Sequence, residues 1–319
     1  MTHVPTLDLP VGIYRLTFTA ETPVSLPEFA GSTWRGAFGH ALKQSVCVMD
    51  MRPCRGCTLE TTCPYPVLFT SPAPADAALM SGYERVPQPY VLRPPLGACD
   101  LRDGDSYTLE LRLFGNANRL RQVAIQALAR TAQNGVGKGR GRLRLTTMSP
   151  STGETDTPPT PAIGSEPGSV AVTFETPLRM KRQGRLLGTN DLTARDVLDA
   201  AVRRVSALMR FHAGGPPDID FRGIKAAMQR AELRDRDLVW RDWARWSGRQ
   251  KAYIQLGGVV GTVELDLNAC PELWPFLALA SETHMGKAAT MGLGRMTLHD
   301  PAAYSHNAFD RPIHSPQTP

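Results

Sequence analysis

The sequence predicts an α+β protein in which one β-α-β-β-α-β unit occurs twice, the order that defines the ferredoxin-like (RRM-like) fold. Three observations predict it: a length of 319 residues, two short sequence echoes at nearly the same offset, and the same alternation of strand and helix patterns in each half. Domains usually contain about 100 to 200 residues, so the length fits two, and either half could bury a core of its own.

The two echoes occur in the same order in each half. Glu-Thr-Pro begins at Glu21 and again at Glu175, 154 residues later. A glycine-rich segment that leads into an apolar, strand-like run begins at Gly139 and again at Gly292, 153 residues later. Two matches at almost one offset are much less expected by chance than either alone, so they indicate a duplicated unit.

Each half contains the same series of local patterns. In the first half, alternating apolar residues predict strands at Ile13–Ala20 and Tyr107–Phe114 and a further strand beginning at Leu143. Apolar residues at helical spacing predict helices at Trp34–Val46 and Arg119–Ala132. The second half repeats this order, with strands expected at Val170–Phe174, Ala252–Gly257, Gly261–Leu267 and Arg295–Leu298 and helices around Arg195–Phe211 and from Pro271.

Composition marks the boundary between the two units. Fifteen of the twenty residues from Ser149 to Gly168 are Gly, Pro, Ser or Thr, and they show neither a helical nor a strand period. We therefore expect domains at residues 1–148 and 169–300, a linker at 149–168, and a flexible, proline-containing tail at 301–319.

The overall composition excludes several classes of protein. Hydrophobic residues are 42% and charged residues 21% of the chain, which is ordinary for globular proteins and excludes wholesale disorder, a coiled coil and a collagen-like chain. No run of 18 apolar residues occurs, and Met1–Pro10 lacks the basic and then apolar order of a signal peptide. We therefore expect a cytoplasmic protein with no membrane partner.

The charge distribution favours a polyanionic partner. Lys and Arg number 36 against 30 Asp and Glu, a net charge of +6, and only six of the cations are Lys. From Leu111 to Gly153 there is no acidic residue and there are eight cations: Arg112, Arg119, Arg121, Arg130, Lys138, Arg140, Arg142 and Arg144. The forked guanidinium suits bidentate contact with phosphate. The alternative is a solvated basic face without a ligand.

Four of the six cysteines lie within seventeen residues. They are Cys47, Cys54, Cys57 and Cys63, and they include one Cys-x-x-Cys pair. Because a reducing cytoplasm disfavours disulfides, this clustering favours a metal site. Four thiolates complete a closed tetrahedral shell around zinc, so we expect a structural zinc site inserted in the first domain. The alternative is a set of free cysteines without a metal.

The first predicted helix has an apolar and a polar face. At 100° per residue, Trp34 and Phe38 share the face that would pack on a sheet, whereas Gly36, His40 and Lys43 share the opposite face. A histidine titrates near neutral pH and suits proton transfer, and a lysine can stabilise a developing negative charge. The alternative is a surface histidine without a catalytic role.

A glycine-rich segment precedes the last predicted strand of each half, at Gly135–Gly141 and Gly286–Arg295. Neither matches G-x-x-x-x-G-K-[ST] or a G-x-G-x-x-G that opens a helix, so nucleoside triphosphate and dinucleotide sites are not expected. Backbone without side chains beside Lys and Arg can lie close along a phosphate chain. The alternative is a pair of tight turns.

Other aromatic and titratable residues admit two interpretations. His284 and His212 could each be catalytic or structural, and for His212 we favour the structural role. Trp240, Trp243 and Trp246 are spaced by three, which suggests base stacking or, as we expect, the core face of a helical turn. Because no pattern of a catalytic metal and no G-x-S-x-G nucleophile occurs, we expect chemistry without a metal.

Together these segments resemble the CRISPR-associated endoribonucleases of the RAMP superfamily, which cut precursor CRISPR RNA. The segments that carry the resemblance span residues 15 to 298 and include Trp34–Leu42 with the following cysteines, Arg179–Gly184, Trp246–Gln250, Gly257–Gly261 and His284–Lys287 with Gly292–Arg295. The resemblance implies two ferredoxin-like domains, with RNA crossing a basic cleft between them.

The resemblance also implies roles for particular residues. It implies metal-free cleavage, in which a 2′-hydroxyl attacks the adjacent phosphate, with His40 as general acid or base, Lys43 stabilising charge and His284 as the second choice for the catalytic histidine. CRISPR repeat RNA is the expected partner, with other CRISPR effector subunits as further partners. The RNA-binding residues expected are Arg35, Lys138, Arg140, Arg142, Lys181, Arg182, Arg249, Lys287 and Arg295.

Two other classes of function fit the same residues. One is a catalytically inactive RAMP subunit that binds guide RNA in an effector complex. The other is a zinc-stabilised RNA-binding module outside CRISPR biology. Activity separates the first from a nuclease, and a neighbouring repeat array in the genome separates the second.

Overall fold

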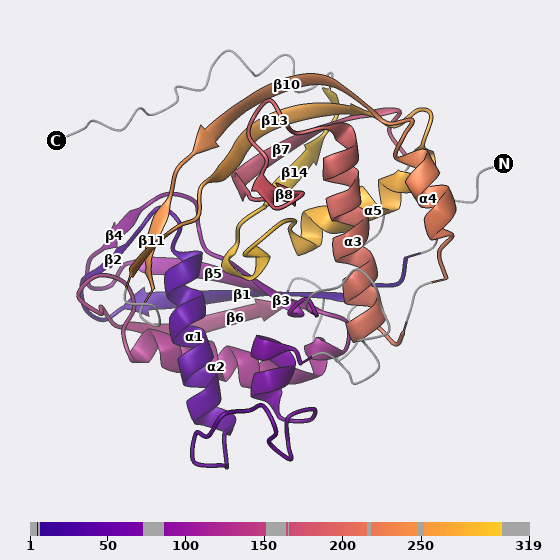
Figure 1. Cartoon of the computed structure of the whole chain (residues 1–319). Coiled ribbons are helices and arrows are strands. Elements are labelled where there is room, and N and C mark those ends of the chain that lie inside the picture. Colours follow the sequence, from indigo (N-terminus) through magenta and orange to yellow (C-terminus); the bar gives the residue numbers. More distant parts are fainter. Residues whose placement is uncertain are drawn as a thin grey trace.

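The computed structural model describes residues 5, 7–72, 86–150, 164, 166–215, 218–247 and 252–301. Within these residues the chain forms two four-stranded antiparallel sheets, each accompanied by two longer helices (Figure 1). The predicted linker lies largely outside the described residues, as does the predicted tail beyond Pro301. The last strand of the first domain continues to Pro150, two residues into the predicted linker.

The N-terminal domain has the sheet order β3-β5-β1-β6. Its strands are β1 (Val11–Ala20), β3 (Tyr90–Arg93), β5 (Ser106–Phe114) and β6 (Leu143–Pro150), and its helices are α1 (Gly31–Val46) and α2 (Arg121–Gln133). Shorter elements are β2 (Val24–Leu26), β4 (Cys99–Leu101), the π-helix η1 (Pro66–Thr70) and the 3₁₀ helix η3 (Gly115–Leu120).

The C-terminal domain has the order β10-β13-β7-β14. Its strands are β7 (Ser169–Leu178), β10 (Glu232–Arg241), β13 (Gly258–Asp266) and β14 (Met296–His299), and its main helices are α3 (Ala194–His212) and α5 (Trp274–Thr283). Shorter elements are β8 (Lys181–Arg182), β9 (Arg185–Leu186), α4 (Phe221–Ala227), β11 (Ala244–Ser247), β12 (Ala252–Gln255), η4 (Pro271–Leu273) and η5 (Ala289–Met291).

The two sheets have the same topology. When the four main strands of each domain are numbered in chain order, both sheets read 2-3-1-4, with antiparallel neighbours throughout. A helix follows the first strand and another follows the third, which is the ferredoxin-like arrangement. The duplication that the two sequence echoes predicted is therefore present in the structure.

The Glu-Thr-Pro echo has a structural explanation in the N-terminal domain. The N–H of Glu21 donates to the carbonyl of Arg142 at 2.9 Å, and the N–H of Arg142 donates to Oγ1 of Thr22 at 2.8 Å. The end of the first strand is thus tied to the exit of the glycine-rich segment, where the last strand begins.

The C-terminal domain repeats these contacts. The N–H of Glu175 donates to the carbonyl of Arg295, and the N–H of Arg295 donates to Oγ1 of Thr176, both at 2.9 Å. The two echoes are therefore the two sides of one hydrogen-bonded junction. This explains why they recur together at nearly the same offset.

Two expectations for the C-terminal domain are wrong. The strand predicted at Ala252–Gly257 was expected in the main sheet, but β12 pairs with β11, and β10 takes that place in the sheet. Trp240, Trp243 and Trp246 were expected on a helical turn, but Trp240 belongs to β10 and Trp246 to β11. Strand pairing places Trp240 opposite Val259 of β13, and Trp240 is 39% exposed rather than part of the core. A spacing of three over seven residues is too short to distinguish a helix from a strand, and long-range pairing with β13 decides the outcome.

The two domains share a buried apolar layer. Leu9 and Val11 at the start of the N-terminal sheet, together with Val91 and Phe114, belong to the same core cluster as the apolar faces of α3 and α5. The other face of β1 carries Tyr14, Leu16 and Phe18 into a second cluster with α1 and α2. Each face of the N-terminal sheet is therefore covered by helices, one pair from each domain.

None of the helices in the part of the chain that the structure describes combines the length and the apolar character needed to cross a membrane.

The first turn of α1 touches the C-terminal domain directly. A Cβ atom placed on Gly31 would lie 1.8 Å from the carbonyl oxygen of Met291, which belongs to the second glycine-rich segment. Gly36, on the same helix, has open space where a Cβ would stand. Only the first of these glycines is required by packing.

We expect opposite effects when these two glycines are replaced. Gly36→Ala should raise the free energy of unfolding by about 0.5–1 kcal/mol, because alanine favours an exposed helix interior. Gly31→Ala should lower it by about 1–3 kcal/mol, because the added methyl group forces the domains apart. Denaturant unfolding of both variants measures this, and equal effects would contradict the packing described.

Candidate active site

Helix α1 presents one face to the core and another to solvent. Trp34 and Phe38 are buried, and the indole nitrogen of Trp34 donates to the hydroxyl of Tyr107 at 3.1 Å. On the opposite side Gly36 and His40 are exposed, as the helical period predicted. No atom lies within 4 Å of the Cβ position of Gly36. This face of α1 is therefore open to solvent at Gly36 and His40.

Lys43 turns toward the cysteine segment. Its Nζ donates to the carbonyls of Met51 at 2.9 Å and Arg52 at 2.8 Å, and it lies 5.7 Å from the ring centroid of Tyr65. An ammonium group has three N–H donors, so one is left over. The structure thus gives Lys43 a part in holding this loop as well as its predicted position beside His40.

Arg35 connects the two domains. Its Nε donates to Oγ1 of Thr290 at 3.0 Å, and its guanidinium lies 4.4 Å from the ring centroid of Phe69. Burial raises the pKa of Tyr90 to about 12, and the charge of Arg35 opposes this shift. Arg35 is therefore a partly buried cation that anchors the second glycine-rich segment to α1.

His284 lies in the interior of the protein. Its side chain is fully buried, and Nδ1 lies 3.3 Å from the carbonyl oxygen of Leu293, to which it donates as the N–H tautomer. Burial, with the nearby charges of Arg93 and Arg112, lowers the pKa of His284 well below its ordinary value. This placement favours a structural role at the base of the glycine-rich segment.

A group of buried charges that the sequence did not reveal crosses the domain boundary. Arg112 is 7% exposed and pairs with Glu110 at 2.7 Å and with Glu282 of α5, while Arg93 pairs with Glu110 at 3.2 Å. Burial lowers the pKa of Arg93 to about 10. Arg112 was expected among the cations of a polyanion-binding surface. That part of the prediction is wrong, because Arg112 is buried and forms ion pairs at the domain junction.

The predicted RNA-binding cations of the N-terminal domain are exposed. Lys138, Arg140 and Arg142 lie on the loop between α2 and β6, and all three side chains face solvent. The N–H of Lys138 donates to the carbonyl of Ser25 at 3.0 Å, which fixes the loop against β2. Arg140 donates to the carbonyl of Asn134 at 3.1 Å. Lys138, Arg140 and Arg142 therefore make this loop an exposed basic segment.

The predicted cations of the C-terminal domain divide into two groups. Lys181, Arg182 and Lys287 are exposed, and the N–H of Lys287 donates to the carbonyl of Arg179 at 2.8 Å, so the glycine-rich segment lies beside the β8–β9 hairpin. Arg295 is partly buried and pairs with Glu175. Arg249 lies outside the described residues.

A small groove lies beside the contact between the start of α1 and the C-terminal domain, and Arg93, Arg295, Gly31 and Gly292 are among the residues that line it. Gly31 and Gly292 are buried, and both arginines are ion-paired, Arg93 with Glu110 and Arg295 with Glu175. Arg93, which no local motif in the sequence marks, therefore belongs to the domain junction.

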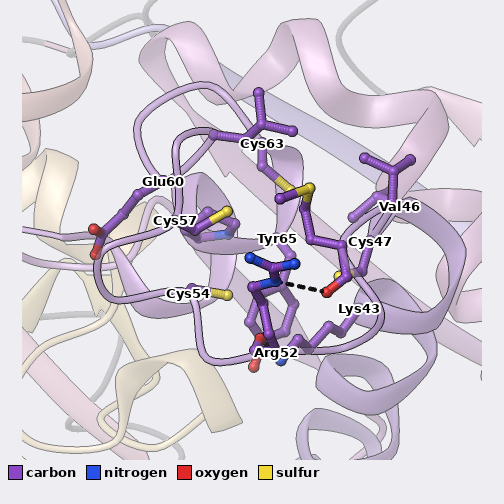
Figure 2. A pocket seen from close by; sticks show the side chains of 13 residues that line it. Lys43, Val46, Cys47, Arg52, Cys54, Cys57, Glu60, Cys63 and Tyr65 are labelled. Carbon is purple, nitrogen blue, oxygen red and sulfur yellow. Dashed lines mark hydrogen bonds between the residues drawn. The ribbon is translucent and has the colours of Figure 1, made fainter.

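The four clustered cysteines lie at the other end of α1. Cys47, Cys54, Cys57 and Cys63 all line one hollow, together with Lys43 (Figure 2). Burial raises the pKa of Cys54, Lys43 lowers it, and the other three thiols raise it further. In the described residues no three His, Cys, Asp or Glu side chains already stand as metal ligands.

Comparison with known proteins agrees with this architecture. Residues 172–296 match the family described as CRISPR-associated endoribonuclease Cas6, and residues 9–166 match AF_1859_N, described as an N-terminal domain. No curated protein matches the chain.

Several solved structures share the fold. A Cas6 product complex is 18% identical with a TM-score of 0.53, over 92% of this chain and 100% of the other. A product complex of another Cas6 is 17% identical with a TM-score of 0.55, over 91% and 100%. Cas6 of Thermus thermophilus is 15% identical with a TM-score of 0.53, over 92% and 100%.

The chain consists of two ferredoxin-like domains, each with a glycine-rich segment before its last strand. The match of residues 172–296 to the Cas6 family, together with the Cas6 structures of similar fold, supports a CRISPR-associated RAMP-type endoribonuclease. This confirms the resemblance found in the sequence.

The burial of His284 predicts a pH dependence of stability. Its folded pKa is depressed, so between the ordinary pKa of about 6.5 and the folded value only the unfolded chain binds a proton. The stability that His284 contributes is complete above about pH 6.5 and declines by about 1.4 kcal/mol per pH unit below it. Urea unfolding at several pH values gives the free energy of unfolding of wild type and of His284→Asn. The difference between these two free energies should shrink as pH falls. A pH-independent difference would contradict it.

Proposed function

We propose that this protein binds CRISPR repeat RNA and cuts it, without a catalytic metal, to make guide RNAs. The observation that carries the proposal is the exposed His40 on α1, in a chain whose C-terminal part matches the Cas6 endoribonuclease family. The exposed basic loops in both domains support binding of an RNA backbone.

The proposed reaction is an internal transesterification. The 2′-oxygen of the nucleotide before the cut attacks the neighbouring phosphorus and loses its proton. The bond from phosphorus to the 5′-oxygen breaks, and that oxygen leaves with the electron pair and takes up a proton. The products are a 2′,3′-cyclic phosphate and a 5′-hydroxyl. Nothing is oxidised or reduced, so one proton donor and one acceptor suffice, and His40 supplies one of these roles.

Cations stabilise the negative charge that develops on the phosphate. Lys43 retains one N–H donor after its two bonds to the loop, and it sits one helical turn from His40. The exposed Lys138 and Lys287 extend the contact along the RNA.

The proposal includes further CRISPR proteins as partners. One structure of similar fold is a Cas6-RT-Cas1–Cas2 complex, 13% identical with a TM-score of 0.54, in which this chain covers 29% of the other chain. That protein works within a larger assembly, and we extend the same kind of association to this chain.

The reaction is tested with purified protein and labelled RNA of the repeat beside its gene, in EDTA. Cleavage at one position should resist EDTA and leave a 5′-hydroxyl. His40→Ala should reduce the rate by about 10²- to 10⁴-fold, the usual loss for a general acid or base. His299→Ala removes another exposed histidine, on β14, and should leave the rate unchanged.

The opposite outcomes are equally clear. Tight binding of the repeat without cutting by the wild type would identify an inactive RAMP subunit. Cutting that needs added magnesium would overturn the metal-free mechanism. Full activity of His40→Ala would exclude His40 as the proton-transfer group.

Binding and cutting should depend on different residues. The double variant Lys138→Ala/Arg142→Ala should bind repeat RNA more weakly. It should also reduce the slope of log K against log salt by about 0.7 for each lost phosphate contact, without changing the cleavage rate at saturating RNA. Lys225→Ala, an exposed lysine of α4, is the control. An unchanged salt dependence in the double variant would place the RNA elsewhere.

A further inference from the structure

We propose that Cys47, Cys54, Cys57 and Cys63 bind one zinc ion as thiolates, and that this site holds the C-terminal end of α1 and the segment that packs on Arg35. The proposal does not depend on the proposed cleavage reaction. It starts from the position of the four thiols, which line a single hollow at the end of α1 (Figure 2).

The backbone fixes three of the cysteines at turns. Cys47 ends α1, and its N–H donates to the carbonyl of Lys43 at 2.9 Å. The N–H of Cys57 donates to the carbonyl of Cys54 at 2.9 Å, and Gly56 between them has φ of +78°. This tight turn places the Cys-x-x-Cys pair on one side of the loop. Figure 2 shows both of these thiols pointing into the hollow.

The segment has no apolar core that would hold it. In the fully described stretch from Cys47 to Cys63, no residue is buried and no strand or α-helix forms. Its large apolar side chains are exposed: Val48 is 75%, Met51 40% and Leu59 38% accessible. Seventeen residues without a fully buried side chain have little apolar burial to hold them, and a bound metal supplies stability in small loops of this kind.

The charges around the hollow suit a thiolate site. Four thiolates around Zn²⁺ carry a net charge of −2, and two cations, Lys43 and Arg52, line the same hollow together with one carboxylate, Glu60. Sulfur ligands select zinc over calcium and magnesium, which prefer oxygen. The thiols do not stand at ligand geometry in this structure, so zinc binding requires the four sulfurs to move together until each lies about 2.3 Å from the metal.

The site connects to the candidate active site through aromatic rings. Two residues after Cys63, Tyr65 stacks on Phe69 with ring centroids 5.4 Å apart. Phe69 in turn carries the guanidinium of Arg35 at 4.4 Å and lies against α1 at Gly39, where a Cβ would meet its ring at 2.2 Å. Loss of the metal should therefore loosen the support of Arg35, which reaches across to the C-terminal domain.

Metal content and spectroscopy of the full chain test the proposal. Protein purified without chelators should contain about one zinc per chain, and replacement by Co²⁺ should give the intense sulfur-to-cobalt charge-transfer and visible bands of a tetrahedral thiolate site. Cys54→Ser/Cys57→Ser should lose the zinc and the cobalt spectrum. Cys99→Ser changes a cysteine outside the hollow and should keep both.

Several outcomes would overturn the proposal. Wild-type protein that takes up neither zinc nor cobalt excludes the site, whether or not the variants fold. Zinc retained by Cys54→Ser/Cys57→Ser, with a normal circular dichroism spectrum, would place the metal elsewhere. Bound iron with visible absorption would identify an iron–sulfur cluster instead. None of these readouts requires RNA cleavage, so failure of the proposed reaction does not affect them.

Hydrogen exchange tests the connection to α1. Removal of zinc from the wild type by a chelator should speed amide exchange in residues 47–70 and in the C-terminal turns of α1, whereas β13 should be unaffected. Unchanged exchange at Phe69 and in α1 would show that the metal, if bound, stabilises only its own loop.

Discussion

The close contact between the first turn of α1 and the glycine-rich segment of the C-terminal domain is the constraint on which the rest of the molecule depends. A Cβ on Gly31 would meet the carbonyl of Met291 at 1.8 Å, and one on Gly292 would meet the carbonyl of Leu92 at 2.8 Å. Backbone therefore packs directly on backbone across the domain boundary, which leaves little freedom to shift. The C-terminal domain in this way sets the position of the helix that carries His40.

The arginines of this protein have two different functions, which a count of charge does not separate. Buried Arg112 and Arg93 satisfy Glu110 and Glu282 across the domain junction, where an unpaired charge would be costly. Their positive field, added to burial, keeps His284 neutral. The exposed cations of the loops remain available to phosphate. Fewer cations are therefore exposed than the acid-free stretch of sequence from Leu111 to Gly153 contains, because Arg112 is buried.

Helix α1 unites the nuclease proposal and the metal proposal. Its first turn contacts the glycine-rich segment, its outer face exposes His40, and its last turn begins the cysteine segment. Arg35 spans from Phe69 to Thr290 and so joins the cysteine side of the helix to the C-terminal domain. A change at either end of α1 therefore reaches the helix that positions the proposed proton-transfer group, although neither end need touch RNA.

The sequence by itself determined the duplication, the amphipathic helix with His40 on its outer face and the grouping of four cysteines. Each of these three features depends on local spacing or on a repeat, and spacing and repeats are visible along the chain. Only the tertiary structure decided that His284 and Arg112 are buried, that Trp240 lies on a strand, and that Arg93 lines the groove. Burial and strand pairing are set by residues more than a hundred positions away or on another element, as when Arg112 meets Glu282, and no local period records such partners.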